Sequence, residues 1–432
     1  MDNNMIALLG FLGLFTMIAL RVPVGIAMGI VGVLGFAAVT SLDAALGVLA
    51  TSPLRSVTNY NLSLIPMFIL MGVFASATGM SRELFRAGQA WLGGFRGGAA
   101  MSTMAACGGF AAICGSSVAT AATMTRVALP EMRRTGYADS LSTGLIASGG
   151  TLGILIPPSV VLVLYGFLTD QDIGQLFVAG VIPGLLAILL SFVTIRVLGM
   201  LRPESMPAGE RSNWREKVDS LRGIWAVVLL FIAIVGGIYV GAVTPVEASA
   251  LGAFCTFLIG VLRRRLTLRS TLSCLLDALR TSVAIFTILI GAMLFGYFLT
   301  VTQTPQLLTT WLTSLPVGDY GVLLLILALF LVLGCVLDPM AMIILMVPIL
   351  YPVITSLGFD PIWFGIIVVV AVELGMITPP IGINVFVIRS VAPDVALGTI
   401  FKGVMPFVVA DLLRLALLIL FPALVLFLPG KM

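Results

Sequence analysis

Three hydroxyl side chains lie close together in the middle of a long apolar stretch. The segment Gly115-Ser116-Ser117-Val118-Ala119-Thr120 joins them to a glycine and carries no charge. Hydroxyl and backbone oxygens are the ligands that a hard, weakly held cation such as Na⁺ requires. Small hydroxyl residues also serve as packing residues between membrane helices. The clustering of three favours a cation site.

A second segment contains the residues that break helices. Gly149, Gly150 and Gly153 precede Pro157-Pro158, and glycine and proline cost a helix about 1 and 3 kcal/mol per residue. We therefore expect the helix to unwind, which leaves carbonyl groups that a bound cation can satisfy. A new helix starting near Ser159 would direct its positive end at an anion in the gap. A proline kink packed against its neighbours is the alternative.

The chain repeats this plan at a constant offset of 222 residues. The Pro-Pro pair at 157 recurs at 379 (379 − 157 = 222), and three further positions match without a gap: Pro23 with Pro245, Pro130 with Pro352, and Gly136 with Gly358. Duplicated halves with helices interrupted at corresponding places are typical of secondary transporters, whose binding site lies at the breaks.

The second copy carries charged side chains at its critical positions. Asp338 occupies the position of Ser116, and a carboxylate at membrane depth costs about 3 kcal/mol. Because no Lys, Arg or His lies in the same apolar stretch, we predict that Asp338 helps to bind a cation, with a helix cap as the alternative. We expect Glu373 either to bind a cation or to stabilise the surrounding helices. Asp411 and Arg414, three residues apart, are expected to neutralise each other.

The composition indicates a polytopic membrane protein. Of the 432 residues, 60% are hydrophobic and 10% charged, and the mean hydropathy is +1.17, whereas soluble proteins have about 25% charged residues. A crossing helix needs about 20 apolar residues. We predict an all-α integral membrane protein with ten spans, at residues 5–20, 23–41, 62–79, 139–168, 175–197, 223–241, 246–262, 281–301, 361–388 and 403–429.

Two further apolar stretches, 98–130 and 320–352, are too long for one crossing and have small or polar residues in the middle. We expect re-entrant hairpins, whose tips must be buried in protein or line a wet cavity. Each half then has five transmembrane helices and one hairpin. The first repeat covers 1–200, with the broken helix 139–168, and the second covers 223–432, with the broken helix 361–388.

The distribution of charge predicts the orientation. If each hairpin enters and leaves on one side, one face collects all but three of the 23 Lys and Arg residues; the exceptions are Arg55, Arg414 and Lys431. The positive-inside rule makes that face cytoplasmic and both termini periplasmic. The stretch 201–222 is then a cytoplasmic linker. Because each half has an odd number of crossings, the two repeats are inverted.

The sequence lacks residues that several classes of function require. The chain has no histidine, which excludes Ser-His-Asp catalysis and imidazole metal sites, and it has no Gly-rich phosphate loop. We therefore predict no enzymatic activity and no nucleotide-driven transport. The formal net charge of +4 does not indicate a nucleic-acid partner.

Four segments resemble the large permease (M) subunit of TRAP transporters, the tripartite ATP-independent periplasmic carriers. They are Gly115-Ser116-Ser117-Val118-Ala119-Thr120-Ala121-Ala122, Gly153-Ile154-Leu155-Ile156-Pro157-Pro158-Ser159, Thr244-Pro245-Val246-Glu247-Ala248 and Thr378-Pro379-Pro380-Ile381-Gly382-Ile383-Asn384. The resemblance runs nearly from end to end. Val246 stands where another threonine is common, and this departure affects no predicted ligand.

The resemblance implies an elevator-type carrier in which hairpins and broken helices form the moving body. It assigns one Na⁺ site to Ser116, Ser117, Thr120, Gly150 and Gly153, and another to Asp338, Gly375 and Thr378. It places the substrate between the hairpin tips, near Ser117, Pro158, Ser159 and Asn384.

The resemblance also implies partners. We expect a carrier in the bacterial inner membrane that uses Na⁺ to import an organic acid, such as a C4-dicarboxylate or a sialic acid. A periplasmic binding protein would deliver the acid, and a small four-helix membrane subunit would support the scaffold in the lipid bilayer. The alternative is a stand-alone divalent-anion/Na⁺ symporter with similar hairpins.

Overall fold

The computed structural model describes residues 2–201, 204, 206–207 and 212–432, and within them it contains helices and connecting turns but no β-strand. The all-α prediction is confirmed. Seven helical segments of this described part are long and apolar enough to cross a membrane. They are Tyr60–Ala77, Ile173–Leu201, Trp214–Tyr239, Pro245–Leu262, Leu268–Val301, Pro339–Ser356 and Leu397–Leu420. Several other predicted spans form shorter helices or pairs of helices, because their segments end at a turn or break.

The helix bounds repeat at the offset seen in the sequence. Helix α7 (Ser117–Arg134) has the same length as α17 (Pro339–Ser356), and adding 222 to the bounds of α7 gives those of α17. Similar pairs are α6 (Gly98–Cys114) with α16 (Gly318–Gly334), α8 (Asp139–Thr151) with α18 (Pro361–Ile377), and α9 (Val160–Thr169) with α19 (Ile383–Val391). The peptide bonds Pro157-Pro158 and Pro379-Pro380 are both cis. The two halves therefore share one local plan.

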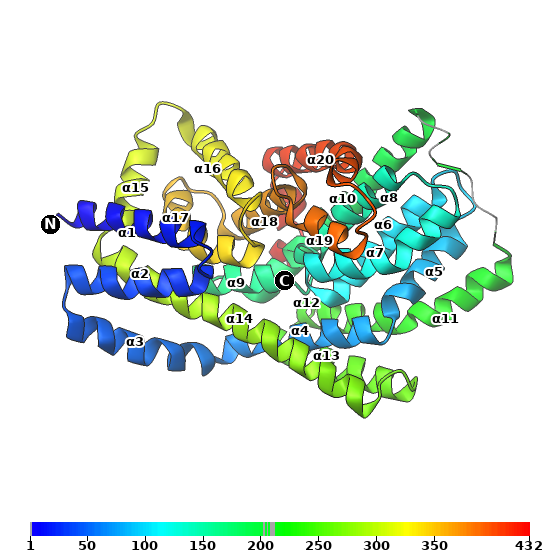
Figure 1. Ribbon diagram of the computed structural model, residues 1–432, viewed down its shortest axis with the longest axis horizontal. Helices are drawn as coiled ribbons and strands as arrows, with labels where there is room; N and C mark the ends of the chain where they lie inside the picture. Colours follow the sequence, from blue (N-terminus) through cyan, green and yellow to red (C-terminus); the bar gives the residue numbers. More distant parts are fainter. Residues whose placement is uncertain (1, 202–203, 205, 208–211) are drawn as a thin grey trace.

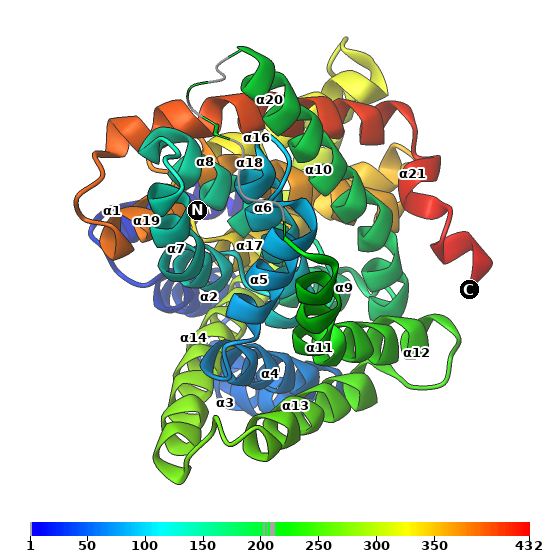
Figure 2. The same cartoon turned by 90° about the vertical axis from the view of Figure 1, so that its right-hand side faces the viewer.

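One layer of the molecule consists of helices that run without a break and cross one another (Figures 1 and 2). It contains α2 (Val24–Val39), α4 (Leu64–Ala77), which continues the 3₁₀-helical turn Tyr60–Ser63, α13 (Pro245–Leu262) and α14 (Leu268–Val301). A Cβ atom added to Gly291 of α14 would lie 1.9 Å from the carbonyl oxygen of Gly25 in α2, so this crossing requires glycine on both helices. We call these four helices the crossing layer.

Against the crossing layer lie the two helical hairpins and the two broken helices. Hairpin 1 is α6 and α7, and hairpin 2 is α16 and α17; each broken helix is a pair, α8 with α9 and α18 with α19. Helix α20 (Leu397–Leu420) packs along α8, where a Cβ on Gly403 would lie 1.6 Å from the carbonyl oxygen of Ser140. We call these elements, together with α10 (Ile173–Leu201), the hairpin body. Figure 2 shows α8, α18 and α20 on the side opposite α3, α4 and α13.

Three helices were not among the predicted elements. They are α3 (Leu42–Val57), α5 (Met80–Leu92) and α15 (Thr304–Thr313), each shorter than a crossing helix. Helix α3 lies beside α2 and α14 at one end of the molecule (Figure 1). The remaining helices are α1 (Asn3–Ala19), α11 (Trp214–Phe231), which continues to Tyr239 through a π-helical turn, and the short α21 (Ala423–Leu426).

Several predicted boundaries differ from the structure. Helix α14 begins at Leu268 rather than 281, because Thr267 and Ser270 form a capping box and the charged first turns remain helical. Its 34 residues extend about 50 Å, more than the hydrocarbon thickness, so it tilts or projects into water. The predicted last span, 403–429, ends at Leu420, just before Pro422. Part of the predicted linker 201–222 lies outside the described residues, and α11 begins within it at Trp214.

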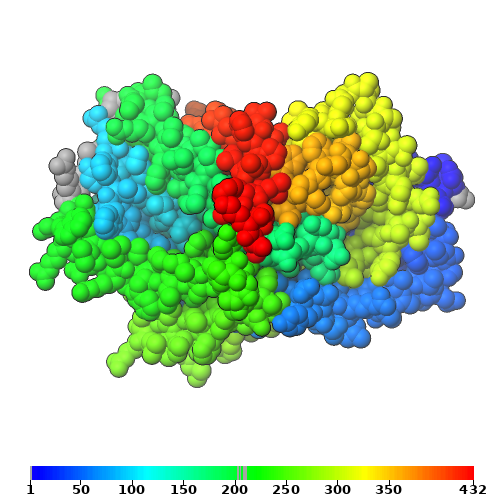
Figure 3. Space-filling view, turned by 180° about the vertical axis from the view of Figure 1, so that it is seen from behind, coloured from blue at the N-terminus to red at the C-terminus, as the bar shows by residue number. Residues whose placement is uncertain are grey.

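The molecule is elongated (Figure 3). The C-terminal segment lies on this face as a narrow strip between residues of the first and second halves. Large apolar side chains are exposed along α1, α3, α10 and α14, for example Leu8, Leu54, Leu185 and Leu279. Such exposure suits a protein whose solvent is lipid.

Candidate functional site

The tip of hairpin 1 lies directly against the first broken helix. Gly115 has φ +62°, and a Cβ there would lie 2.7 Å from the carbonyl oxygen of Pro158. A larger residue would be strained and would separate the tip from the break. Ser116 caps α7 by accepting a hydrogen bond from the Ala119 amide at 3.4 Å, and the Thr120 hydroxyl donates to the Ser116 carbonyl at 2.8 Å.

The residues predicted for the first Na⁺ site gather at this contact. A Cβ on Gly153 would lie 2.5 Å from the Ser116 carbonyl oxygen and 2.9 Å from the Ser117 amide nitrogen. Gly150 lies one turn earlier, with its Cβ direction toward Ala121, 2.8 Å away. The site therefore offers hydroxyl and carbonyl oxygens around a backbone contact that only glycine allows, a donor set that fits Na⁺.

Of the residues predicted for the second Na⁺ site, Gly375 and Thr378 lie at a similar contact between hairpin tip and broken helix. A Cβ on Gly375 would lie 2.7 Å from Gly334, at the end of α16, and the Thr378 hydroxyl is 3.3 Å from the Cys335 sulfur. The break thus contacts the tip of hairpin 2. The Thr378 hydroxyl also donates to the Leu374 carbonyl at 2.8 Å.

Asp338 caps helix α17. Its Oδ2 atom accepts hydrogen bonds from the amides of Met340 at 3.1 Å and Ala341 at 3.4 Å. The cap that the sequence left as an alternative is therefore present. No hydrogen bond within the described residues joins Asp338 to Gly375 or Thr378, and the residue is exposed. The free oxygen remains available to a ligand.

Both hairpin tips line a single cavity of about 1320 Å³ between the hairpin body and the crossing layer. Ser116 and Asp338 face it together with Val160, the first residue of α9. Three helices, α7, α9 and α17, therefore begin at the cavity, and their positive ends favour an anion there. The opposite wall is formed by α14, from Arg269 through Asp277 to Ile288, together with residues of α2 and α4.

The side chains predicted to bind substrate do not line the cavity. They lie behind the wall that the hairpin tips and the start of α9 form. Ser117, Ser159 and Asn384 have 2% exposure or less, Pro158 is buried, and none of the four lines the cavity. The Ser159 hydroxyl donates to the Ile154 carbonyl at 2.5 Å and accepts from the Leu162 amide, so it caps α9. The amide of Asn384 donates to the Ala147 carbonyl at 3.2 Å, which joins the two broken helices.

A buried ion cluster lies next to the second break. Arg414 Nη2 is 2.5 Å from Glu373 Oε2 and 3.1 Å from Asp411 Oδ1. The sequence predicted the pair on α20 from its spacing of three residues. It left the partner of Glu373 open, because contacts between helices far apart in sequence have no local pattern.

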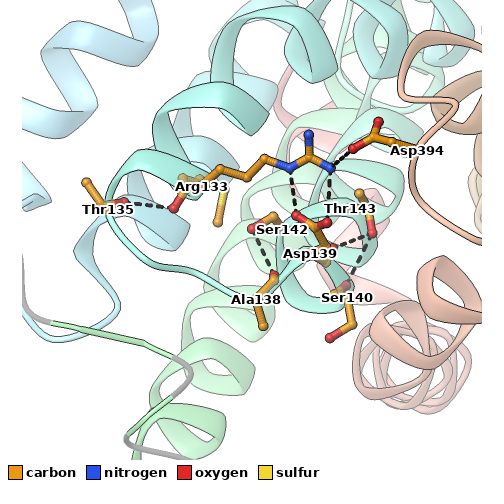
Figure 4. A network of polar contacts seen from close by, with 9 residues as sticks. Arg133, Thr135, Ala138, Asp139, Ser140, Ser142, Thr143 and Asp394 are labelled. Carbon is orange, nitrogen blue, oxygen red and sulfur yellow. Dashed lines mark hydrogen bonds and ion pairs between the residues drawn. The ribbon is translucent and has the colours of Figure 1, made fainter.

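Ion pairs also join the end of α7, the start of α8 and the segment after α19 (Figure 4). Arg133 donates to both oxygens of Asp139, at 2.7 and 3.0 Å, and to Asp394 at 2.5 Å. The hydrogen bond from Arg133 lowers the pKa of Asp394. Since Asp394 follows α19 and Asp139 begins α8, the contact joins the ends of the two broken helices.

Comparison with known proteins identifies the family. The family model for the "Tripartite ATP-independent periplasmic transporter, DctM component" matches residues 11–424. The chain belongs to this family. Similar proteins include the C4-dicarboxylate TRAP transporter large permease protein DctM of Pseudomonas aeruginosa, 38% identical over 86% of this chain and 87% of that protein. The sialic acid TRAP transporter large permease protein SiaM of Vibrio cholerae is 31% identical over 98% and 97%.

A solved structure supports the fold. The YdaH transporter of Alcanivorax borkumensis matches with a TM-score of 0.64 over 88% of this chain and 90% of that one, at 15% sequence identity. The resemblance to TRAP large permeases is thus confirmed, and this chain is a multi-pass transporter permease and not an enzyme.

Proposed function

We propose that this TRAP permease imports an organic acid across a bacterial inner membrane and couples the import to Na⁺. The observation that carries the proposal is the convergence of both hairpin tips and the start of α9 on one cavity. The relatives named for C4-dicarboxylates and sialic acid share carboxylate cargo. Three helix N-termini suit such a group.

The chain's residues would hold Na⁺ at the two contacts between hairpin tip and broken helix. The first set is Ser116, Ser117, Thr120, Gly150 and Gly153, and the second is Asp338, Gly375 and Thr378. A cation at these places supplies positive charge that offsets the cargo carboxylate. The cavity wall formed by Ser116, Val160 and Asp338 would then contact the cargo, while Ser117, Pro158, Ser159 and Asn384 hold that wall in shape.

The layered packing supports an elevator mechanism. The hairpin body is joined internally by close backbone contacts, such as those of Gly153 and Gly403, and by the Arg133 ion pairs. The cavity lies between the hairpin tips and α14 of the crossing layer, while α4 touches the tip of hairpin 1, where a Cβ on Gly72 would lie 2.7 Å from the Cys114 carbonyl oxygen. A body of this kind would carry the site past the crossing layer, with both termini on the periplasmic side.

The proposal includes two partners, a periplasmic binding protein and a small four-helix membrane subunit. The cavity offers helix ends and a single arginine, Arg269, with Asp277 and Asp338 also in its lining, so we expect it to bind its cargo weakly and to depend on delivery. Reconstituted with only the small subunit, the chain should show little uptake, and the cognate binding protein should restore it in the presence of Na⁺. Robust saturable uptake by this chain alone would instead support the stand-alone symporter.

A further inference from the structure

The ion cluster of Glu373, Asp411 and Arg414 is one of the most deeply buried polar features of the molecule. The exposed fractions of these residues are 0%, 6% and 0%. One guanidinium nitrogen contacts both carboxylates, so the two acidic groups are held close together. In the described structure, Glu373 Oε1, Asp411 Oδ2, Arg414 Nε and Arg414 Nη1 have no hydrogen-bond partner.

The charges of this cluster do not cancel. Two carboxylates and one guanidinium leave one negative charge when all three are ionised. A charge taken out of water costs several kcal/mol unless another charge compensates it. No other ion pair of the described residues reaches Glu373 or Asp411. Either a proton on one carboxylate or a cation nearby therefore compensates this charge.

The nearest predicted cation site is two residues away. Glu373 lies in the last turns of α18, just before Gly375, whose backbone touches the end of α16 at Gly334. Thr378, the C-cap of α18, lies against Cys335 of the same tip. Gly375 and Thr378 provide only neutral oxygens. Arg414 on α20 thus fixes the end of α18 at which this site would form.

The first repeat has no equivalent cluster. Subtracting 222 from the three positions gives Thr151, Leu189 and Phe192, which carry no charge. The Thr151 hydroxyl donates to the Ser148 carbonyl of its own helix at 2.8 Å. The buried negative charge therefore belongs to the second site alone.

We infer that Arg414, Glu373 and Asp411 position the second Na⁺ site and add counter-charge to that of Asp338. Arg414 and Glu373 hold the end of α18 against α20, and the excess negative charge of the cluster attracts the cation that Gly375 and Thr378 coordinate. This inference rests on the proposed Na⁺ coupling. Because the attraction is mutual, Na⁺ should also stabilise the cluster.

Asp411→Asn tests the charge, because it keeps the size of the side chain and leaves the Arg414–Glu373 pair intact. In the complete transporter we expect the Na⁺ concentration for half-maximal uptake to rise roughly three- to tenfold, the size of a charge interaction across a few side chains. Maximal uptake at saturating Na⁺ should be retained. Asp319→Asn removes an equal charge from an exposed position on α16 and should leave the Na⁺ dependence unchanged.

A second readout does not depend on transport. Na⁺ should raise the Tm of the purified wild-type complex, and this increase should be smaller in Asp411→Asn and in Glu373→Gln. Wild-type Na⁺ dependence of both uptake and Tm in Asp411→Asn would overturn the inference. If neither neutral variant yields folded protein at any Na⁺ concentration, the cluster is a structural ion pair and the inference is also wrong. A wild-type complex without Na⁺ dependence would instead contradict the proposed coupling itself.

Discussion

Ser116 and Asp338 occupy equivalent positions in the two repeats and have the same local structural role. Each caps the second helix of its hairpin, and each faces the central cavity. They differ in charge, so the two tips are electrostatically unequal. The positive end of α7 meets a neutral hydroxyl, whereas that of α17 meets a carboxylate.

Asp338→Asn separates the role of the charge from the role of the cap, because asparagine also caps helices. We expect the Na⁺ concentration for half-maximal uptake to rise about tenfold, corresponding to about 1.4 kcal/mol of lost binding. Ser116→Ala should produce a smaller shift, since it removes one neutral ligand. Assembly with the small subunit should survive in both. If Asp338→Asn has the wild-type Na⁺ dependence and maximal uptake, Asp338 is a helix cap only.

At the scale of elements, the critical contact is between each hairpin tip and its broken helix. A methyl group at position 153 would lie 2.5 Å from a backbone carbonyl, which cannot rotate away. We expect Gly153→Ala to displace the tip at a cost of about 1–3 kcal/mol and to reduce Na⁺-driven uptake about tenfold or more.

The matched control is Gly296→Ala on α14, where a methyl group meets no atom within 4 Å. It should leave uptake unchanged. Radiotracer uptake into proteoliposomes, normalised to monodisperse protein from size-exclusion chromatography, measures both variants. Equal activity of the two would show that the tip tolerates a looser contact.

At the scale of the whole molecule, contacts link segments that the charge count assigns to one face. Glu83 pairs with Arg263 at 2.6 Å and with Arg265 at 2.7 Å, while Arg133 pairs with Asp394. Arg414, one of the three cationic exceptions, is buried in the hairpin body and therefore says little about orientation.

The proposed orientation can be measured by cysteine labelling. In a background without the five native cysteines, a cysteine at exposed Asp170 should react with an impermeant maleimide in whole cells. A cysteine at Ser212 should react only after the cells are permeabilised. Equal labelling of both positions in intact cells would contradict the proposed topology.

The sequence by itself determined the all-α membrane class, the repeat and the places where helices break. These follow from local properties: hydropathy, the cost of glycine and proline in a helix, and a constant offset of 222 residues. Ser116 and Thr120 were recognised as a cluster because they are close in the chain. The short helices α3, α5 and α15 were missed, since they are too short or too polar for a hydropathy criterion.

Only the tertiary structure decided which residues face the cavity. It buried Ser159 and Asn384 behind the wall, placed Ser116 and Asp338 on it, and paired Glu373 with Arg414, 41 residues away. These outcomes depend on how helices cross, and the crossings depend on contacts such as that of Gly25 with Gly291. Packing between distant segments leaves no periodic signal in the sequence, so residue type predicted the chemistry while the fold decided its position.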